Sequence, residues 1–280
     1  MSWDLTLSTG IALRQPLLQT LASMRQAGFT RVQVTAFLGH FDHHDPSVIA
    51  AVKEELRRLA LQATSLHAPY SDRVDLTLMA DSERAAAVAE VEAQARALAA
   101  LGGRTIVLHP GSASDTANAE AQERLRQGVR SLTEIHRSCR PLGLTLAVED
   151  MLGHLVGGRT HELAWVLSSL PRDGVSLCLD TGHSFLARSL FERVRMFGPR
   201  LGMLHAHDNR GVYDDHLPPG EGNIAWGPLL HRLHEVRFRG EIVLEIAEGP
   251  DVEQSLWRAR RSVLFLQDLC RGKPYAVNLD

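Results

Sequence analysis

The segment LTLAVED (residues 144–150) is an apolar run that ends on two carboxylates. Other hydrophobic runs in the chain also finish at or next to a histidine, aspartate or glutamate. The residues at these ends are His67 in ATSLHAPY, His109 in RTIVLHPG, Glu149 in LTLAVED, Asp180 in VSLCLD, His205 in LGMLHAHD and Glu245 in EIVLEI. A buried strand has no reason to end on a charge unless something beyond its end uses that charge.

Short β-rich runs alternate with longer helical patterns along the whole chain. The predicted strands are 3–8, 31–35, 63–67, 104–109, 144–149, 175–180, 201–207 and 241–246. The predicted helices are 13–27, 46–60, 81–101, 118–142, 160–170, 185–197, 227–236 and 251–270. Near-continuous apolar strands are typical of parallel sheets covered on both faces. We therefore predict an α/β fold, a (β/α)8 TIM barrel, with residues 1–280 forming a single domain.

In such a barrel the C-terminal ends of the strands meet at one mouth, where active sites are built. Side chains alternate along a strand, so Thr145, Ala147 and Glu149 share one face. Glu245 lies at the corresponding place on the last strand. Converging imidazoles and carboxylates predict a divalent-metal site, because both groups are good ligands for zinc, manganese or iron.

Two loops add further candidate ligands. Asp180 and His183 lie three residues apart, which we interpret as a tight turn after the sixth strand. The segment HAHDNRGVYDDHLPPGEGNIAW (205–226) is rich in histidines and acidic residues, and Asp214 and His216 are spaced so that both can face one ion in an extended segment. His207 has the same parity as His205, and the spacing does not decide between them. The loop after the second strand, VTAFLGHFDHHDP (34–46), carries three more histidines close to the expected mouth.

The composition of the chain bears on its binding partners and on its location in the cell. The net charge of −3 gives no global attraction to nucleic acid, although it leaves a local basic patch open. The N-terminus lacks the pattern of a secretory signal, and no apolar run approaches the length of a membrane span. Cys139, Cys178 and Cys270 are widely separated, which favours reduced thiols and a cytoplasmic location. The C-terminal RGKPYAVNLD (271–280) is either a tail or the contact of a homodimer.

The chain resembles the xylose isomerase-like TIM-barrel superfamily, which contains sugar phosphate isomerases and epimerases and also endonuclease IV. The motifs that carry the resemblance are SLHAPY, IVLHPG, AVED, CLDTGH, LHAHDN, DDHLPPGEGNIAW and VLEI. Resemblance to the ketose 3-epimerases implies one manganese-, cobalt- or magnesium-type ion on Glu149, Asp180, His205 and Glu245, which selects His205 over His207. Resemblance to endonuclease IV implies a cluster of two to three zinc ions with five additional ligands. These are His67, His109, His183, Asp214 and His216.

The resemblance favours a metal-dependent isomerase or epimerase acting on a sugar or polyol, with or without a phosphate. Glu149 and Glu245 would move the proton next to a metal-bound carbonyl. His183 and Arg210 would hold substrate oxygens. The alternatives are an abasic-site phosphodiesterase and a dehydratase of the keto-inositol type. The acidic, histidine-rich loop after the second strand disfavours the nuclease, and the arginines near the mouth, Arg73, Arg159 and Arg210, suit a small substrate better than a DNA backbone.

Overall fold

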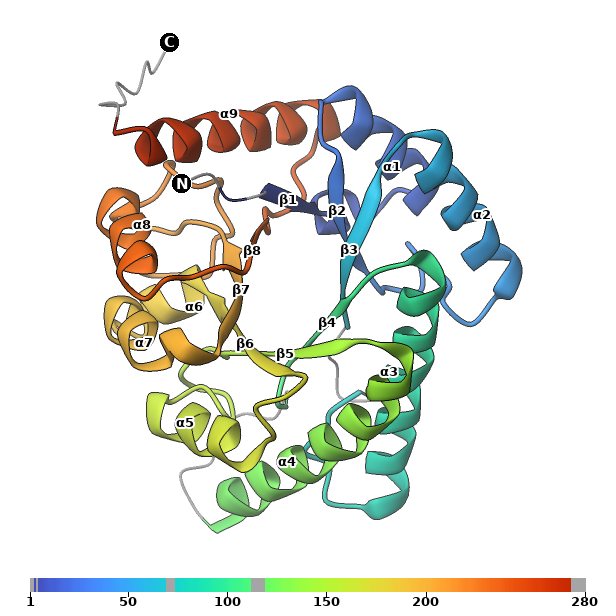
Figure 1. The fold of residues 1–280 in the computed structure, drawn as a ribbon, viewed down its shortest axis with the longest axis vertical. Coiled ribbons are helices and arrows are strands. Elements are labelled where there is room, and N and C mark those ends of the chain that lie inside the picture. The colour runs from blue at the N-terminus through green and yellow to red at the C-terminus, as the bar shows by residue number, and fades with distance from the viewer. Residues whose placement is uncertain (1–2, 4, 69–73, 112–118, 273–280) are drawn as a thin grey trace.

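Eight parallel strands close into a barrel surrounded by helices (Figure 1). The computed structural model describes residues 3, 5–68, 74–111 and 119–272. The strands are β1 (Leu5–Ser8), β2 (Arg31–Thr35), β3 (Gln62–His67), β4 (Thr105–Leu108), β5 (Thr145–Glu149), β6 (Val175–Asp180), β7 (Leu201–Ala206) and β8 (Glu241–Leu244). Each strand pairs in parallel with the next, and β8 pairs with β1 to close the sheet. The predicted (β/α)8 fold is confirmed.

The helices form the outer ring of the barrel (Figure 1). They are α1 (Leu17–Gln26), α2 (Pro46–Arg58), α3 (Asp81–Leu101), α4 (Ala119–Cys139), α5 (Thr160–Ser169), α6 (Thr181–Leu186), α7 (Leu190–Phe197), α8 (Trp226–Glu235) and α9 (Val252–Cys270), with short 3₁₀ turns at Thr9–Ala12, Arg140–Leu142 and Gly198–Arg200. The helix predicted at 185–197 is two helices, because the backbone at Arg188 turns left-handed (φ 53°) and ends α6. Among the described residues, no helix combines the length and the apolar character that a membrane span requires.

The hydrophobic core has two parts. Most apolar side chains pack between the strands and the outer helices, and a separate small cluster consists of Val107, Ala147, Cys178, Met203 and Val243. Each member of the small cluster lies on a different strand from β4 to β8. Because side chains alternate along a strand, the residue two positions further on points to the same side. Those residues are His109, Glu149, Asp180, His205 and Glu245. The small cluster is therefore the apolar floor beneath the predicted ligands.

Candidate metal centre

Glu149 lies at the centre of a buried cluster at the mouth of the barrel. Its Oε2 atom is 3.0 Å from Nε2 of His67 on β3 and 3.0 Å from Nε2 of His109, which follows β4. Its Oε1 atom is 2.8 Å from Nδ1 of His205 on β7. The same nitrogen lies 2.8 Å from Oε2 of Glu245, which follows β8. Side chains from strands far apart in the sequence thus meet as the sequence predicts, and we call them the deep cluster.

A second group, the rim cluster, lies beside the deep cluster. His183 Nε2 is 3.2 Å from Oδ2 of Asp214, and His216 Nε2 is 3.1 Å from the same oxygen. Glu149, Asp180 and His183 also offer ligand atoms within 4.8 Å of one another. Asp180 and His183 therefore connect the two clusters. All nine residues that the sequence suggests as metal ligands lie in this one region.

The rim cluster contains a strained backbone. His216 has a φ of 46°, a left-handed conformation that non-glycine residues rarely adopt. Its Nδ1 atom is 3.0 Å from the carbonyl oxygen of Glu245, which fixes the ring, and its Nε2 atom faces Asp214. Backbone strain of this kind persists where the surrounding structure holds it, often at functional sites. These two contacts place His216, and with it the loop, in the candidate site.

The segment from Asp180 to His183 differs from its prediction. It is the first turn of α6 and not a tight turn, because the Asp180 carboxylate caps the helix by accepting a hydrogen bond from the backbone N–H of His183 (2.7 Å). Gly182 is needed here, since a Cβ atom at this position would lie 2.0 Å from Cε1 of His207. The helix cap therefore orients the carboxylate and the imidazole together.

Spacing along the strand did not decide between His205 and His207, and the resemblance selected His205 as the ligand. The structure places both at the site. His205 joins the deep cluster, whereas His207 Nε2 lies 2.9 Å from both carboxylate oxygens of Asp180. The ring of His207 stacks on His216 with centroids 3.8 Å apart. His207 therefore orients Asp180 and supports His216 between the two clusters.

Two residues that support the candidate ligands were not predicted from the sequence. Gln33 on β2 is fully buried beneath the site, and its Nε2 atom is 3.0 Å from Nε2 of His205. Its Oε1 atom has no hydrogen-bond partner in the described structure. If the amide rotates so that Oε1 accepts from His205 Nε2–H, Nδ1 of His205 presents a lone pair to the site. The feature of the sequence that could have indicated this role is a polar residue within the otherwise apolar strand RVQVT.

Asp150 is the other supporting residue. Its carboxylate accepts from the backbone N–H of Asp180 (2.6 Å), from Ser184 and from the buried guanidinium of Arg193 (2.6 Å). Its carbonyl oxygen lies 2.8 Å from Nδ1 of His183. Asp150 thus positions two of the candidate ligands. The sequence signal was the second carboxylate of AVED, which is buried although it follows the strand.

The carboxylates of the site and most of its histidines favour one another's charged forms, whereas burial lowers the pKa of His109. Burial raises the pKa of Glu149 and Glu245, but nearby histidines outweigh this effect and leave both pKa values lowered. Burial lowers the pKa of His205, yet the surrounding carboxylates and Cys178 raise it well above its ordinary value. For His216, burial also lowers the pKa, while Asp214 and Glu245 raise it to about 9. Such a donor set fits a divalent cation, which would replace protons on the imidazoles and neutralise the carboxylates.

The structure does not bring every predicted residue to the cluster. Arg210 is exposed, and in the described part of the chain no hydrogen bond joins its guanidinium to the candidate ligands. Arg159 pairs with Glu162 at the start of α5. Arg73 lies outside the described residues, as do residues 273–280 of the predicted tail or dimer contact. His40 contacts the carbonyl oxygen of Gln15 instead of the mouth.

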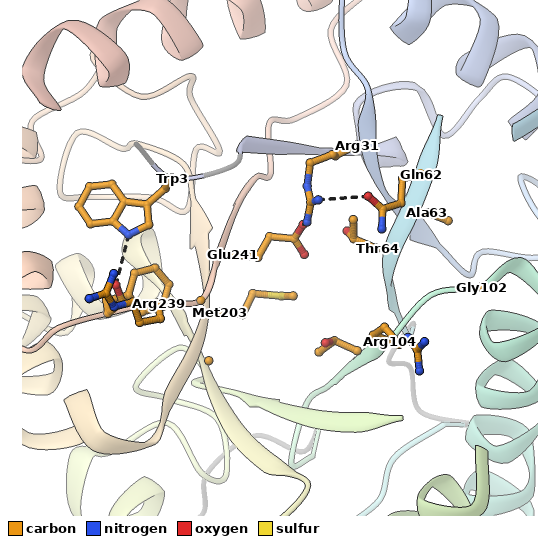
Figure 2. A pocket seen from close by; sticks show the side chains of 14 residues that line it. Trp3, Arg31, Gln62, Ala63, Thr64, Gly102, Arg104, Met203, Arg239 and Glu241 are labelled. Atoms are coloured by element: carbon orange, nitrogen blue, oxygen red, sulfur yellow. Dashed lines mark hydrogen bonds and ion pairs between the residues drawn. The ribbon is translucent and has the colours of Figure 1, made fainter. Parts of the chain in front are cut away.

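A cavity of about 570 Å³ lies at the opposite end of the barrel (Figure 2). It opens among the N-terminal ends of the strands, where Arg31, Gln62 and Glu241 stand (Figure 2). None of the predicted site residues lines it. In TIM-barrel enzymes this face contributes to stability, whereas the reaction takes place at the other face.

The model of the family described as xylose isomerase-like TIM barrel matches residues 21–267. The chain belongs to this family. An uncharacterized protein of Methanocaldococcus jannaschii, MJ1311, is 26% identical over 185 residues, which are 64% of this chain and 63% of that protein. The uncharacterized protein y4fM of Sinorhizobium fredii is 25% identical over 81% of this chain and 79% of its own length. A probable endonuclease 4 of Shouchella clausii is 25% identical over 72% of both chains.

Solved structures share the fold over nearly the whole chain. A D-tagatose 3-epimerase-like protein superposes with a TM-score of 0.80 at 22% identity, covering 95% of this chain and 98% of its own. A D-psicose 3-epimerase solved in the presence of D-fructose gives 0.81 at 17% identity, with 95% and 99% covered. The IOLI protein with a bound zinc atom gives 0.80 at 17% identity, with 95% and 98% covered. At these identities the comparison establishes the fold and leaves the reaction to the site.

Proposed function

We propose that this protein is a divalent-metal-dependent isomerase or epimerase of a sugar or polyol. One observation carries the proposal: carboxylate oxygens of Glu149 and Glu245, from β5 and from the end of β8, both lie 2.8 Å from Nδ1 of His205. The buried carboxylate of Glu149 and the partly buried carboxylate of Glu245, from the ends of two different strands, thus converge on one imidazole. This arrangement suits a reaction in which one carboxylate removes a proton and another returns it.

The ion would be held by Glu149, Asp180, His205 and Glu245. His67 and His109 would contact the Oε2 atom of Glu149. When bound, the ion would polarise the substrate carbonyl and acidify the adjacent C–H bond. The mixture of nitrogen and oxygen donors suits manganese, cobalt or zinc, and a magnesium-type ion would rely on the carboxylates. One ion would bind if only the deep cluster supplies ligands, and several would bind if the rim cluster also supplies them.

In the reaction, one of the two glutamates would accept the proton from the carbon beside the carbonyl. The other would deliver a proton to the opposite face of the same carbon, or to the adjacent carbon. The lowered pKa of Glu149 keeps its carboxylate ionised, the form that can accept a proton. His183 would hold a substrate oxygen through Nε2, since its Nδ1 atom is engaged by the Asp150 carbonyl. Arg210 stays a predicted substrate contact from the exposed rim.

The similarity of the fold to sugar 3-epimerases supports a small carbohydrate as the substrate. Exposed aromatic and aliphatic side chains on the loops after β2 and β7, Phe37, Leu38 and Tyr213, could cover such a molecule. The three cysteines form no disulfide, which suits the proposed cytoplasmic location. A homodimer remains a prediction.

A zinc-dependent phosphodiesterase of the endonuclease type is the second candidate. One specific observation favours it: the rim cluster of His183, Asp214 and His216 completes the ligand set that a cluster of zinc ions would use. Against it, the loop after β2 presents exposed Phe37 and Leu38 together with acidic residues, and not the basic side chains that grip phosphates.

The first test is the metal content of the purified protein, measured by elemental mass spectrometry without added metal. About one manganese, cobalt or magnesium ion per chain would support the isomerase or epimerase. Two or three zinc ions per chain, beyond any ion held outside the mouth, would favour the phosphodiesterase, and incision of abasic DNA would then be assayed. The reaction itself is tested by incubating a panel of ketoses in deuterated water. Deuterium incorporated beside the carbonyl, abolished by a chelator, is the expected result, and its absence over the whole panel would contradict the proposal.

A further inference from the structure

Two neighbouring histidines and a glutamate form a cluster outside the barrel mouth. His43 and His44 lie in the loop after β2, and Glu90 lies on α3. His43 Nε2 is 2.6 Å from Oε1 of Glu90, and His44 Nε2 is 3.0 Å from Oε2 of the same carboxylate. The two imidazole rings are tilted by 41° with centroids 4.3 Å apart. Both Nε2 atoms face the same carboxylate oxygen, Oε1 of Glu90, at 2.6 and 3.1 Å.

The burial of these groups leaves the cluster open on one side. The side chain of His43 is fully buried, that of Glu90 is 25% exposed and that of His44 is 48% exposed. Glu90 is anionic at neutral pH: burial raises its pKa, but the hydrogen bonds and charges of both histidines outweigh this and leave it lowered. Within the described residues, no hydrogen bond or ion pair links these side chains to the nine candidate ligands of the mouth.

We propose that His43, His44 and Glu90 form a second metal site, separate from the mouth, that takes a zinc-class transition-metal ion. The three ligand atoms already lie within 4.8 Å of one another. Tetrahedral zinc with ligands at about 2.0–2.1 Å needs them about 3.3 Å apart. The 2.6 Å contact of His43 with Glu90 would therefore lengthen by about 0.7 Å and the 3.0 Å contact of His44 by about 0.3 Å. Water completes the coordination on the exposed side. Two imidazoles select against magnesium and calcium, which prefer oxygen ligands.

Metal bound here would cross-link the loop after β2 to α3. That loop carries the exposed side chains of Phe37 and Leu38. The ion would therefore restrict the motion of a loop at the C-terminal face of the barrel. His43 Nδ1 is buried without a hydrogen-bond partner, so its N–H would be unsatisfied when Nε2 binds the ion. This cost should weaken metal binding here, and we expect a chelator to remove the ion.

The test counts zinc equivalents bound per chain by equilibrium dialysis and elemental analysis, in the wild type and in His44→Gln. His44 is half-exposed, so this substitution leaves the fold intact. His231→Gln is the matched control, because His231 is also exposed and lies 3.5 Å from a glutamate, Glu235. We expect His44→Gln to bind one zinc ion fewer than the wild type, and His231→Gln to bind the same number. Equal binding by all three proteins overturns the proposal.

Glu90→Gln separates metal binding from hydrogen bonding. A glutamine still accepts hydrogen bonds from both imidazoles, but it is a poor zinc ligand. We expect it to lose the same single equivalent, and full retention would overturn the site. Amide hydrogen exchange of residues 36–45 gives a second readout. Zinc should slow it in the wild type and in His231→Gln but not in His44→Gln, whereas equal slowing in His44→Gln contradicts the proposed cross-link.

Discussion

The two ends of the barrel hold charged side chains in different ways. At the N-terminal end, Glu241 pairs with the permanent cation of Arg31 (2.8 Å) beside a cavity of about 570 Å³. At the C-terminal mouth, the ion-pair partners found for Glu149 and Glu245 in the described structure are histidines. An arginine stays protonated, but an imidazole can release its proton to make room for a metal. Exchangeable charge, more than cavity size, therefore distinguishes the end at which we propose the functional site.

The largest effect is expected from Glu149→Gln. Glu149 is buried and contacts His67, His109 and His205, so the substitution removes both a candidate ligand and a candidate base. Deuterium incorporation into the substrate should fall at least about a hundredfold, the scale of a lost acid–base group. Circular dichroism should show the fold unchanged. Retention of more than a few per cent of the activity would remove Glu149 from the mechanism.

The pH should control metal binding at the mouth. A protonated imidazole cannot bind a metal, and the pKa of His216 is raised to about 9. Below that pH each displaced proton costs about tenfold in affinity per pH unit, so affinity should rise as the pH increases from 7 to 9. A metal titration across this interval measures it. A flat profile would show that His216 is not a ligand.

The raised pKa of His216 also predicts how the stability of the metal-free protein depends on pH. Stability should fall as the pH rises, whereas metal affinity should rise. The folded-state pKa of His216 lies above its ordinary value of 6.5, so its contribution is complete below pH 6.5. That contribution is lost as the pH rises through about 9. Thermal unfolding in the presence of a chelator should therefore show a falling midpoint between these values. Added metal should remove this fall, because the ion replaces the proton.

Gln33→Leu should weaken metal binding without touching a ligand. Gln33 contacts Nε2 of His205, and loss of such supporting contacts typically costs about 10–100-fold in metal affinity. Gln33→Glu should restore much of the affinity, because a carboxylate also accepts from His205 Nε2–H. Isothermal titration of both variants provides the measurement. Equal affinities of Gln33→Leu and the wild type would show that Gln33 only fills space.

The fold and the candidate ligands could be predicted from the sequence because both follow from alternation along the strands. Glu149 lies two positions after Ala147, and Glu245 lies two positions after Val243. Because residues two apart on a strand share a face, an inward-facing Ala147 or Val243 predicts that the following glutamate also faces inward. The strand-end pattern therefore predicted which of these side chains meet at the mouth, without any knowledge of distances between strands.

The supporting contacts were not predictable in this way. Asp150 and Arg193 are 43 positions apart, and their 2.6 Å contact depends on how α7 packs against the barrel. The turn predicted at 180–183 was wrong because the sequence does not show that Asp180 serves both as the end of a strand and as a helix cap. Contacts between residues far apart in the sequence, and residues with two structural roles, are determined by tertiary packing. A local sequence pattern carries no information about that packing.

The smallest effect is expected at the N-terminal end, from Glu241→Gln. Glutamine keeps a hydrogen-bond acceptor for Thr6 and Arg31 but loses the charge of a partly buried ion pair. Such a change typically costs about 1 kcal/mol of the free energy of unfolding. Denaturant unfolding should show this small loss, while metal content and turnover stay at the wild-type level. Because the charge of Glu241 is compensated within the fold, it is not available to a substrate. A loss of turnover or metal in this variant would mean that the two ends are coupled, and the comparison between them would no longer identify the active face.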